Sequence, residues 1–319
     1  MTKRARDHHE LPELYLRGFC QEQAGERRSF LWVYKRAKPF HPGVHKERDN
    51  PHRSGVHETT RIRDRYAITL PNGERDFDSY EHRLQQEETK VNVILTKLRS
   101  RQTISPEEKE KFASYLQLTL LRTSRRLQSA LPEYRKAVDS IPFQRIATSL
   151  ADRGEFGKAR EWLNAERYLR SPDGGEAKLL NESMVAGHNA VLSAFLAKDW
   201  LLYVAPSTAY FVTSDSPLSF DWTSGLSRFP FWFPISREIA LVASPKGAGD
   251  LEYVTASADE IFVINWLTIC QAEAVYSPKS EQWVWDILDH GVSLTDEQER
   301  AFLKVFPQNR MPSRVTDEG

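Results

Sequence analysis

The stretch from Ser105 to Leu120, SPEEKEKFASYLQLTL, carries the clearest structural signals in this 319-residue chain. Ser105 can cap a helix, Pro106 suits the first helical position, and Glu108 completes a capping box with Ser105. Apolar residues then recur at helical spacing, at Phe112, Tyr115, Leu116, Leu120 and Leu127. We therefore expect a helix from Pro106 to about Ala130, ended by Pro132.

The same periodicity extends the helical signal on both sides of this stretch. An apolar stripe runs from Ser79 to Arg99, at Tyr80, Leu84, Val91, Leu95 and Leu98. Downstream, helices are expected at about 141–151 and 155–169, separated by Gly154, and at about 176–199. Together these segments predict a central helical block at about 79–199.

Strand-like runs lie before and after this block. The runs before it are 30–34 and 66–70, and those after it are 201–205, 210–213, 239–243, 251–255 and 272–276. Helices are expected between or after the later strands at 259–269, 280–288 and 293–306, the last with a capping box of Thr295 and Gln298. This order predicts an α+β fold. We expect short N-terminal strands, the helical block, and a C-terminal mixed or antiparallel sheet, in one domain with a core at 8–290 and frayed ends at 1–7 and 307–319.

The charge balance is even overall but uneven along the chain. The 44 basic and 44 acidic residues cancel, which removes any global attraction to nucleic acid or an anionic membrane. Basic residues nevertheless exceed acidic ones between Lys3 and Arg65, and six of the nine histidines precede residue 60. If nucleic acid is a partner, the basic segment Lys35–Arg65 is the expected contact. The alternative is a solvated surface of mixed charge.

Two cysteines and the distribution of apolar residues exclude several classes of protein. Cys20 and Cys270 cannot build a disulfide framework or a four-cysteine zinc site. The charged first ten residues do not resemble a signal peptide, and no apolar run approaches ~18 residues. We therefore expect a cytosolic protein with reduced thiols and no membrane partner.

Candidate site residues gather in two short motifs. The paired histidines His8 and His9 lie in a charged opening run, and Asp215 lies in Thr213-Ser214-Asp215-Ser216-Pro217 after an apolar run. Imidazoles and carboxylates are the usual groups of metal sites and of acid–base catalysis. Adjacent histidines share one site only where the backbone is irregular, because they point apart in a strand or a helix. Asp215 equally suits an Asx turn that serves structure alone.

Two charged residues lie on helical faces that should be apolar. Glu88 shares a face with Leu84, and Arg122 follows Phe112, Tyr115 and Thr119 at helical spacing. Because a lone buried charge costs several kcal/mol, we expect Glu88 and Arg122 to face each other, or one of them to reach a polar site. The alternative is a salt bridge that only organises the helical hairpin. His188 lies on an apolar face and is more typical of a satisfied core histidine.

These residues predict a site composed of His8, His9, Glu88, Arg122 and Asp215, with His9, Glu88 and Asp215 as ligands of a divalent metal. No His-Glu-x-x-His motif is present to strengthen the metal reading. Ser214 lacks a nucleophile elbow, and Cys20 is more typical of a buried thiol than of a nucleophile.

The same positions carry a family resemblance. Residues 8–19, HHELPELYLRGF, with Leu31–Tyr34, Arg122-Thr123, Phe211–Pro217 and Phe233–Ser236, resemble the bacterial family known as domain of unknown function 4238. The resemblance runs from about residue 8 to about 280. It implies a single α+β unit of bacterial origin, and the family supplies no established activity. The stretch before Tyr66, which includes His57, Arg61 and Arg63, is more basic and histidine-rich than the family pattern.

Hydrolysis is the simplest chemistry for this set of residues, because no phosphate loop or dinucleotide fingerprint is present. One or two divalent metals would activate water, and Arg122 would hold an anionic substrate. A phosphodiester fits the basic N-terminal segment, as in a nuclease-like effector of bacterial defence. The alternatives are a non-catalytic interaction module with a structural polar network, and a sensor of a small anion.

Overall fold

The computed structural model describes residues 7–21, 29–36, 51–63, 66–70, 72–178, 189–220, 230–244 and 251–306, and in these residues a run of helices lies between two groups of strands. The predicted α+β class is confirmed. Residue contacts divide the chain into two compact units, each made of three segments. Unit 1 comprises 1–10, 61–89 and 121–187, and unit 2 comprises 11–60, 90–120 and 188–319. The single-domain boundaries stay a prediction.

A five-stranded mixed sheet forms the centre of unit 2. Its order is β12 (Leu251–Thr255), β7 (Asp199–Val204), β11 (Ile239–Ser244), β10 (Phe231–Ser236) and β9 (Ser219–Phe220). Only the β12–β7 pair is parallel among these strands. This agrees with the predicted C-terminal mixed sheet.

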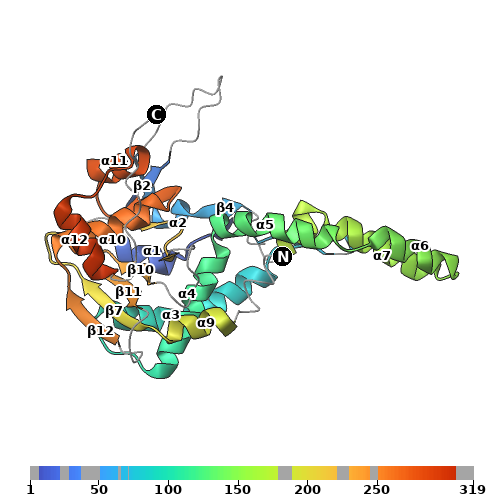
Figure 1. Cartoon of the computed structure of the whole chain (residues 1–319), viewed down its shortest axis with the longest axis horizontal. Coiled ribbons are helices and arrows are strands. Elements are labelled where there is room, and N and C mark those ends of the chain that lie inside the picture. Colours follow the sequence, from blue (N-terminus) through green and yellow to red (C-terminus); the bar gives the residue numbers. More distant parts are fainter. Residues whose placement is uncertain are drawn as a thin grey trace, which may run out of the picture. The chain divides into compact units, whose positions relative to one another are not determined.

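Alternate residues of this sheet enter two different hydrophobic clusters. Phe233 and Leu241 pack with residues of α3 (Ser79–Arg99), α4 (Pro106–Arg122) and α9 (Asn189–Leu196). Trp232 and Val242 pack instead with residues of α10 (Ala258–Cys270) and α12 (Asp296–Val305). Both helices are labelled in Figure 1. Because strand residues alternate between faces, helices cover both sides of the sheet. All six residues of β10 are accordingly buried.

Strand β10 has no counterpart among the predicted strands. It contains Pro234, which cannot donate a ladder hydrogen bond and argues against a central strand. The pairing of β10 with β11 shifts register between Pro234 and Ser236, so a bulge accommodates the proline. A strand buried on both faces also lacks the apolar–polar alternation that would reveal it.

A four-stranded sheet, also in unit 2, joins the two ends of the chain. Its order is β3 (His52–Gly55), β2 (Phe30–Lys35), β13 (Ala274–Ser277) and β8 (Thr213–Ser214), all antiparallel. Strand β2 confirms the predicted run at 30–34. Helix α11 (Gln282–His290) packs against this sheet through Val284 and Ile287. Strands β2 and β3 thus share a sheet with later parts of the chain, because β2 pairs with β13, which follows it by about 240 residues.

The predicted start of the central helices is confirmed, and the predicted stop at Pro132 is wrong. Helix α3 spans Ser79–Arg99 as expected, and α4 begins with the capping box. There Ser105 N donates to Glu108 Oε2 (2.9 Å), and Glu108 N donates to Ser105 Oγ (3.2 Å). Helix α4 ends at Arg122, where Thr123 adopts extended backbone, and α5 (Ser124–Asp139) then runs through Pro132. A proline removes one helical hydrogen bond without always ending the helix.

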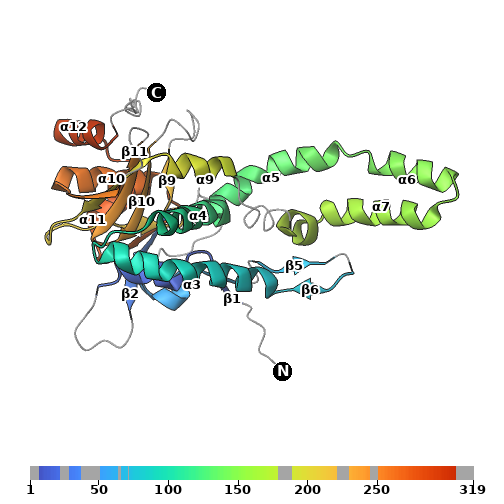
Figure 2. The same cartoon turned by 90° about the horizontal axis from the view of Figure 1, so that it is seen from below.

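Unit 1 contains α5, α6 (Phe143–Asp152) and α7 (Phe156–Leu169), with two small antiparallel β pairs. Helices α6 and α7 lie side by side in Figure 2, and they match the predictions at 141–151 and 155–169. Gly154 between them has φ +79°, a conformation that glycine adopts without strain. The β pairs are β1 (Asp7–His9) with β4 (Arg61–Arg63), and β5 (Ile68–Thr69) with β6 (Arg75–Asp76).

The predicted helix at 176–199 is only partly within the described residues. A π-helical turn, η2 (Pro172–Glu176), precedes residues 179–188, which lie outside them, and α9 then ends at Leu196. Helix α12 begins as predicted, with Thr295 and Gln298 in a capping box. Among the described helices, none combines the length and the apolar character that a bilayer crossing requires.

Candidate functional site

The paired histidines lie on a short strand of unit 1. Strand β1 pairs with β4 in regular antiparallel register, with His9 opposite Arg61. Successive positions of a strand alternate between its faces, so the backbone is not the irregular kind that a shared histidine site requires. His9 is partly buried, and its carbonyl accepts a hydrogen bond from Tyr66 Oη (3.3 Å). The side chain of His8 lies outside the described residues.

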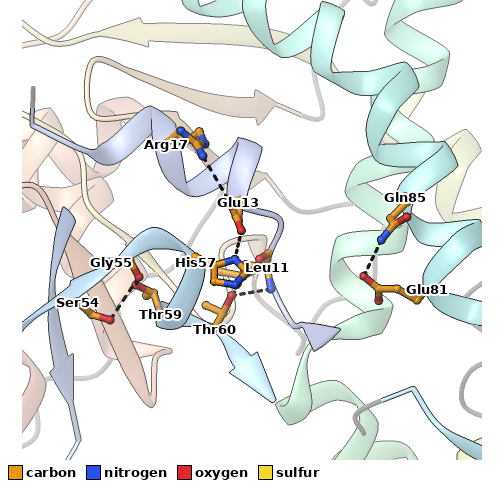
Figure 3. Close-up of polar contacts among 10 residues, drawn as sticks. All are labelled: Leu11, Glu13, Arg17, Ser54, Gly55, His57, Thr59, Thr60, Glu81 and Gln85. Carbon is orange, nitrogen blue, oxygen red and sulfur yellow. Dashed lines mark hydrogen bonds and ion pairs between the residues drawn. The ribbon is translucent and has the colours of Figure 1, made fainter. Parts of the chain in front are cut away.

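The two charged residues predicted on helical faces also belong to unit 1. Glu88 is partly buried on α3, and Leu84 on the same face is buried as expected. On this helix Gln85 Nε2 donates to Glu81 Oε1 (3.3 Å), as Figure 3 shows. Arg122 ends α4, with its side chain outside the described part of the chain, as is His188. The predicted Glu88–Arg122 contact therefore stays a prediction.

Asp215 lies in unit 2, where it ties the end of β8 to the start of β13. Its Oδ1 accepts hydrogen bonds from Glu273 N (3.1 Å) and Ala274 N (3.2 Å), and its own N donates to Ala274 O (2.9 Å). These are contacts between distant parts of the chain and not the local hydrogen bond of the Asx turn considered for Asp215. The five predicted site residues are thus divided between two units, and their convergence stays a prediction.

The neighbours of Asp215 are also engaged in structural hydrogen bonds. Thr213 is buried, and its Oγ1 lies 2.6 Å from Tyr15 Oη. Ser214 is buried, and its Oγ accepts from Ser216 N (3.2 Å). A buried hydroxyl that already caps a turn is poorly placed to attack a substrate, which argues against Ser214 as a nucleophile.

A pair of substitutions separates the structural role of Asp215 from a catalytic one. We expect Asp215→Ala to lower the free energy of unfolding by about 1–3 kcal/mol, because two backbone N–H groups lose their acceptor. Asp215→Asn keeps an oxygen acceptor and should lose less than half as much. Urea unfolding measures both values. Equal losses for the two variants would contradict the hydrogen-bonding role.

A second set of polar residues, within unit 2, was not predicted as a site. Glu13 begins helix α1 (Glu13–Leu16), and His57 lies on α2 (Val56–Thr59). His57 Nδ1 contacts Glu13 Oε1, and Arg17 Nη2 donates to Glu13 Oε2 (3.3 Å), as drawn in Figure 3. The carboxylate of Glu13 is therefore held between an imidazole and a guanidinium.

Two hydrogen bonds between Leu11 and Thr60 hold the segments of α1 and α2 together. Thr60 Oγ1 donates to Leu11 O (2.9 Å), and Leu11 N donates to Thr60 Oγ1 (3.4 Å), as Figure 3 shows. Both residues are buried. This double contact fixes the chain before α1 against the end of α2, and so positions Glu13 beside His57.

The Glu13–His57 pair opens into a pocket of about 450 Å³. Its polar lining comes from Glu13, Arg17, Ser29, His57 and Glu58, and Phe30 adds an aromatic wall. The side chain of Glu13 is 30% exposed and that of His57 is 67% exposed. A half-shielded carboxylate that holds an accessible imidazole can orient it for proton transfer. Glu13 and His57 also offer one oxygen and one nitrogen as metal ligands.

Cys20 lies near this site without the properties of a nucleophile. It is buried, and its Sγ contacts Leu16 O at 3.7 Å. Burial raises the pKa of the Cys20 thiol to about 11, against a smaller opposing effect of Arg17. At neutral pH the thiolate is therefore scarce, which supports the reading of Cys20 as a core residue.

The sequence offered no direct signal for the Glu13–His57 pair. Glu13 and Arg17 have the four-residue spacing of a helical ion pair, which is common on surfaces. His57 follows Glu13 by 44 residues, and only tertiary structure brings the two together.

Comparisons with known proteins identify a family for this chain and do not indicate an activity. No curated protein and no solved structure matches the chain. The model of one family, described as a protein of unknown function, matches residues 7–280. This range contains every residue discussed above as a site candidate. The chain therefore belongs to the DUF4238 family.

Proposed function

We propose that this protein is a phosphodiester hydrolase in which His57, oriented by Glu13, takes the proton from the attacking water. The supporting observation is the contact of Glu13 with His57 Nδ1 in the lining of a pocket. A carboxylate that accepts from Nδ1–H stabilises the tautomer in which Nε2 carries the lone pair. The same carboxylate stabilises the imidazolium that forms after proton transfer.

One cationic side chain in the pocket wall, Arg17, supports an anionic substrate, and it lies there with the carboxylates of Glu13 and Glu58. The predicted nucleic-acid segment Lys35–Arg65 supplies His57 and Glu58 to the pocket wall. Arg53, on the same segment, lies over the ring of Phe30 with its Cζ 4.2 Å from the ring centroid. A guanidinium can bind a phosphate group, and an aromatic ring can stack on a nucleobase. The pair therefore points to an oligonucleotide as the substrate class.

The reaction consumes only water and the diester. Water loses a proton to His57 as its oxygen bonds to phosphorus, and the bond from phosphorus to the leaving oxygen breaks. The proton returns from the imidazolium to the leaving oxygen. The products are a phosphate monoester and an alcohol, and the imidazole is regenerated.

A divalent metal is the second part of the proposal. It would stabilise charge on the phosphoryl oxygens and lower the pKa of bound water. The ligands predicted from the sequence are His9, Glu88 and Asp215. Asp215 Oδ1 already accepts two backbone hydrogen bonds, which weakens its case. His9→Ala is therefore the more informative metal-ligand variant.

The test measures hydrolysis of bis(p-nitrophenyl) phosphate and of labelled single-stranded DNA and RNA, with Mg²⁺, Mn²⁺, Zn²⁺ or EDTA. We expect His57→Ala to lower kcat/KM by about 10²–10⁴-fold, the usual contribution of a general base. Glu13→Gln should cost about 10–100-fold, because it only orients the imidazole.

The matched control is His290→Ala, which removes an exposed histidine at the end of α11. Its activity should equal that of the wild type. Full activity in His57→Ala, or no hydrolysis by the wild type under any of these conditions, would contradict the proposal.

The second candidate function is a non-catalytic interaction module or small-anion sensor. It is favoured by the Thr213–Pro217 motif, whose side chains make structural hydrogen bonds. Thermal unfolding separates the two readings. If the protein is a non-catalytic module with a structural network, Asp215→Ala should lower its Tm, and the wild type should show no hydrolysis. If the protein is a sensor, the Tm of the wild type should rise when the anion is added.

A further inference from the structure

A second hollow, of about 360 Å³, adjoins the His57 pocket in unit 2. Both are lined by Arg17 and Ser29, so the two spaces share a wall. Its other polar lining residues are Arg99, Ser236, Arg237 and Glu238. Three arginines and one carboxylate therefore face this space, which we call the arginine hollow.

Arg99 brings a positive charge with neutral hydrogen-bond partners. Its guanidinium donates to Leu14 O (3.1 Å), Tyr15 O (3.0 Å) and Ile235 O (3.2 Å). Burial lowers the pKa of Arg99, because the charged form has lost part of its hydration. The carbonyls orient the group without cancelling its charge. An anion placed nearby would compensate this lost hydration.

Arg237 and Ser236 add donors at the rim of the hollow. Arg237 Nη2 lies 3.4 Å from Glu238 Oε1, and with the side chains 35% and 55% exposed this pair contributes little to stability. Ser236 Oγ accepts from Glu238 N and Ile239 N, both at 3.2 Å. With its oxygen so engaged, the hydroxyl of Ser236 is directed to act as a donor. These groups suit an acceptor with several oxygens.

The three arginine charges all act on the thiol of Cys20. Arg17, Arg99 and Arg237 each act to lower the pKa of the buried Cys20 thiol, although burial has the larger, opposite effect. Cys20 lines the same hollow. Three cationic side chains therefore line one cavity together with a single carboxylate, that of Glu238.

We propose that the arginine hollow binds a phosphate group of the substrate, one that is not cleaved, while the adjoining pocket holds the diester beside His57. The proposal rests on the proposed hydrolysis and narrows its substrate to a chain with at least two phosphates. Guanidinium groups bind phosphate oxygens through paired, charge-assisted hydrogen bonds. Arg17 lies in both walls and contacts Glu13, so it links the two sites.

The first experiment measures binding without turnover. Isothermal titration of the full chain with inorganic phosphate, at constant ionic strength, should give one saturable site. Arg237→Gln should weaken it about tenfold or more, since one charged donor is lost. Arg237→Lys keeps the charge but not the forked geometry and should be intermediate. Arg300→Gln, an exposed arginine of α12, is the control and should bind as the wild type does.

The second experiment compares a dinucleotide with and without a 5′-phosphate as substrates. Arg237→Gln should raise KM about tenfold for the phosphorylated substrate only, with kcat nearly unchanged. Unfolding curves of Arg237→Gln and Arg237→Lys establish that both variants are folded. If Arg237→Gln loses affinity for phosphate while Arg237→Lys retains that affinity, the result still supports the site.

The outcomes separate this inference from the proposed function. Saturable phosphate binding that Arg237→Gln weakens, together with no hydrolysis, supports the arginine hollow and contradicts the hydrolase. Hydrolysis that depends on His57, with phosphate binding equal in the wild type and Arg237→Gln, contradicts the hollow alone. Absence of saturable phosphate binding in the wild type also overturns it.

Discussion

Replacing Arg99 by methionine should lower the free energy of unfolding by about 3–5 kcal/mol, because three backbone carbonyls lose a donor. Two of these carbonyls, Leu14 O and Tyr15 O, belong to helix α1, and the third, Ile235 O, belongs to β10. Arg99 therefore fastens the helix that carries Glu13 to the central sheet. Urea unfolding followed by tryptophan fluorescence measures the loss.

Two control variants define what the Arg99 result means. Lysine at this position keeps a charge but cannot reach three carbonyls with one planar group, so Arg99→Lys should lose at least half as much. Arg300→Met removes an exposed arginine and should change stability by less than about 0.5 kcal/mol. A loss below about 1 kcal/mol for Arg99→Met would contradict the fastening role.

The position of Arg99 also explains the glycine in the Arg17-Gly18-Phe19 turn. A Cβ placed on Gly18 would lie 2.5 Å from Arg99 Nη2. Since this guanidinium is held by several hydrogen bonds, it cannot move aside without breaking them. The family-like sequence at 17–19 thus reflects a close approach between backbone and side chain.

Replacing Asn265 by leucine should lower the free energy of unfolding by about 2–4 kcal/mol. Asn265 is buried on α10, where its Oδ1 accepts from Val212 N (2.9 Å) and its Nδ2 donates to Tyr210 O (2.9 Å). Leucine has a similarly branched side chain but satisfies neither group, and each unpaired buried group costs about 1–3 kcal/mol. Thermal and urea unfolding both report the change.

The control for Asn265 is Asn164→Leu on α7, where the asparagine is exposed. It should change stability by less than about 0.5 kcal/mol. Asn265→Asp keeps the acceptor for Val212 N but loses the donor for Tyr210 O, so it should also destabilise. Equal stability of Asn265→Leu and the wild type would show that residues 210–212 do not depend on this side chain.

Elements with local signals were predictable from the sequence. Helix α3 was predicted at 79–99 and strand β12 at 251–255, as observed. The capping boxes at Ser105 and Thr295 mark their helices because the signal lies within four residues. Strand β10 was not predicted, because burial on both faces removes its alternation and Pro234 argues against a strand.

The candidate site was less predictable, because its contacts join distant parts of the chain. Asp215 was correctly placed in a turn at the end of a strand, but its hydrogen bonds to residues 273 and 274 could not be foreseen. The Glu13–His57 contact depends on the packing of α1 near α2, which no local pattern encodes. Arg99 lies on a helix whose apolar stripe is clear in the sequence. The carbonyl groups to which its guanidinium donates could not be predicted, because they belong to distant segments.

The order of the two units along the chain limits how this protein can be divided. Unit 1 and unit 2 alternate three times each, so a cut at any bond within residues 11–187 separates segments of both. No single crossover in a gene could therefore transfer either unit whole to another protein within that range. We therefore expect both units to be retained together during evolution. In fragment-exchange experiments, we expect folded chimaeras only when all three segments of a unit are moved together.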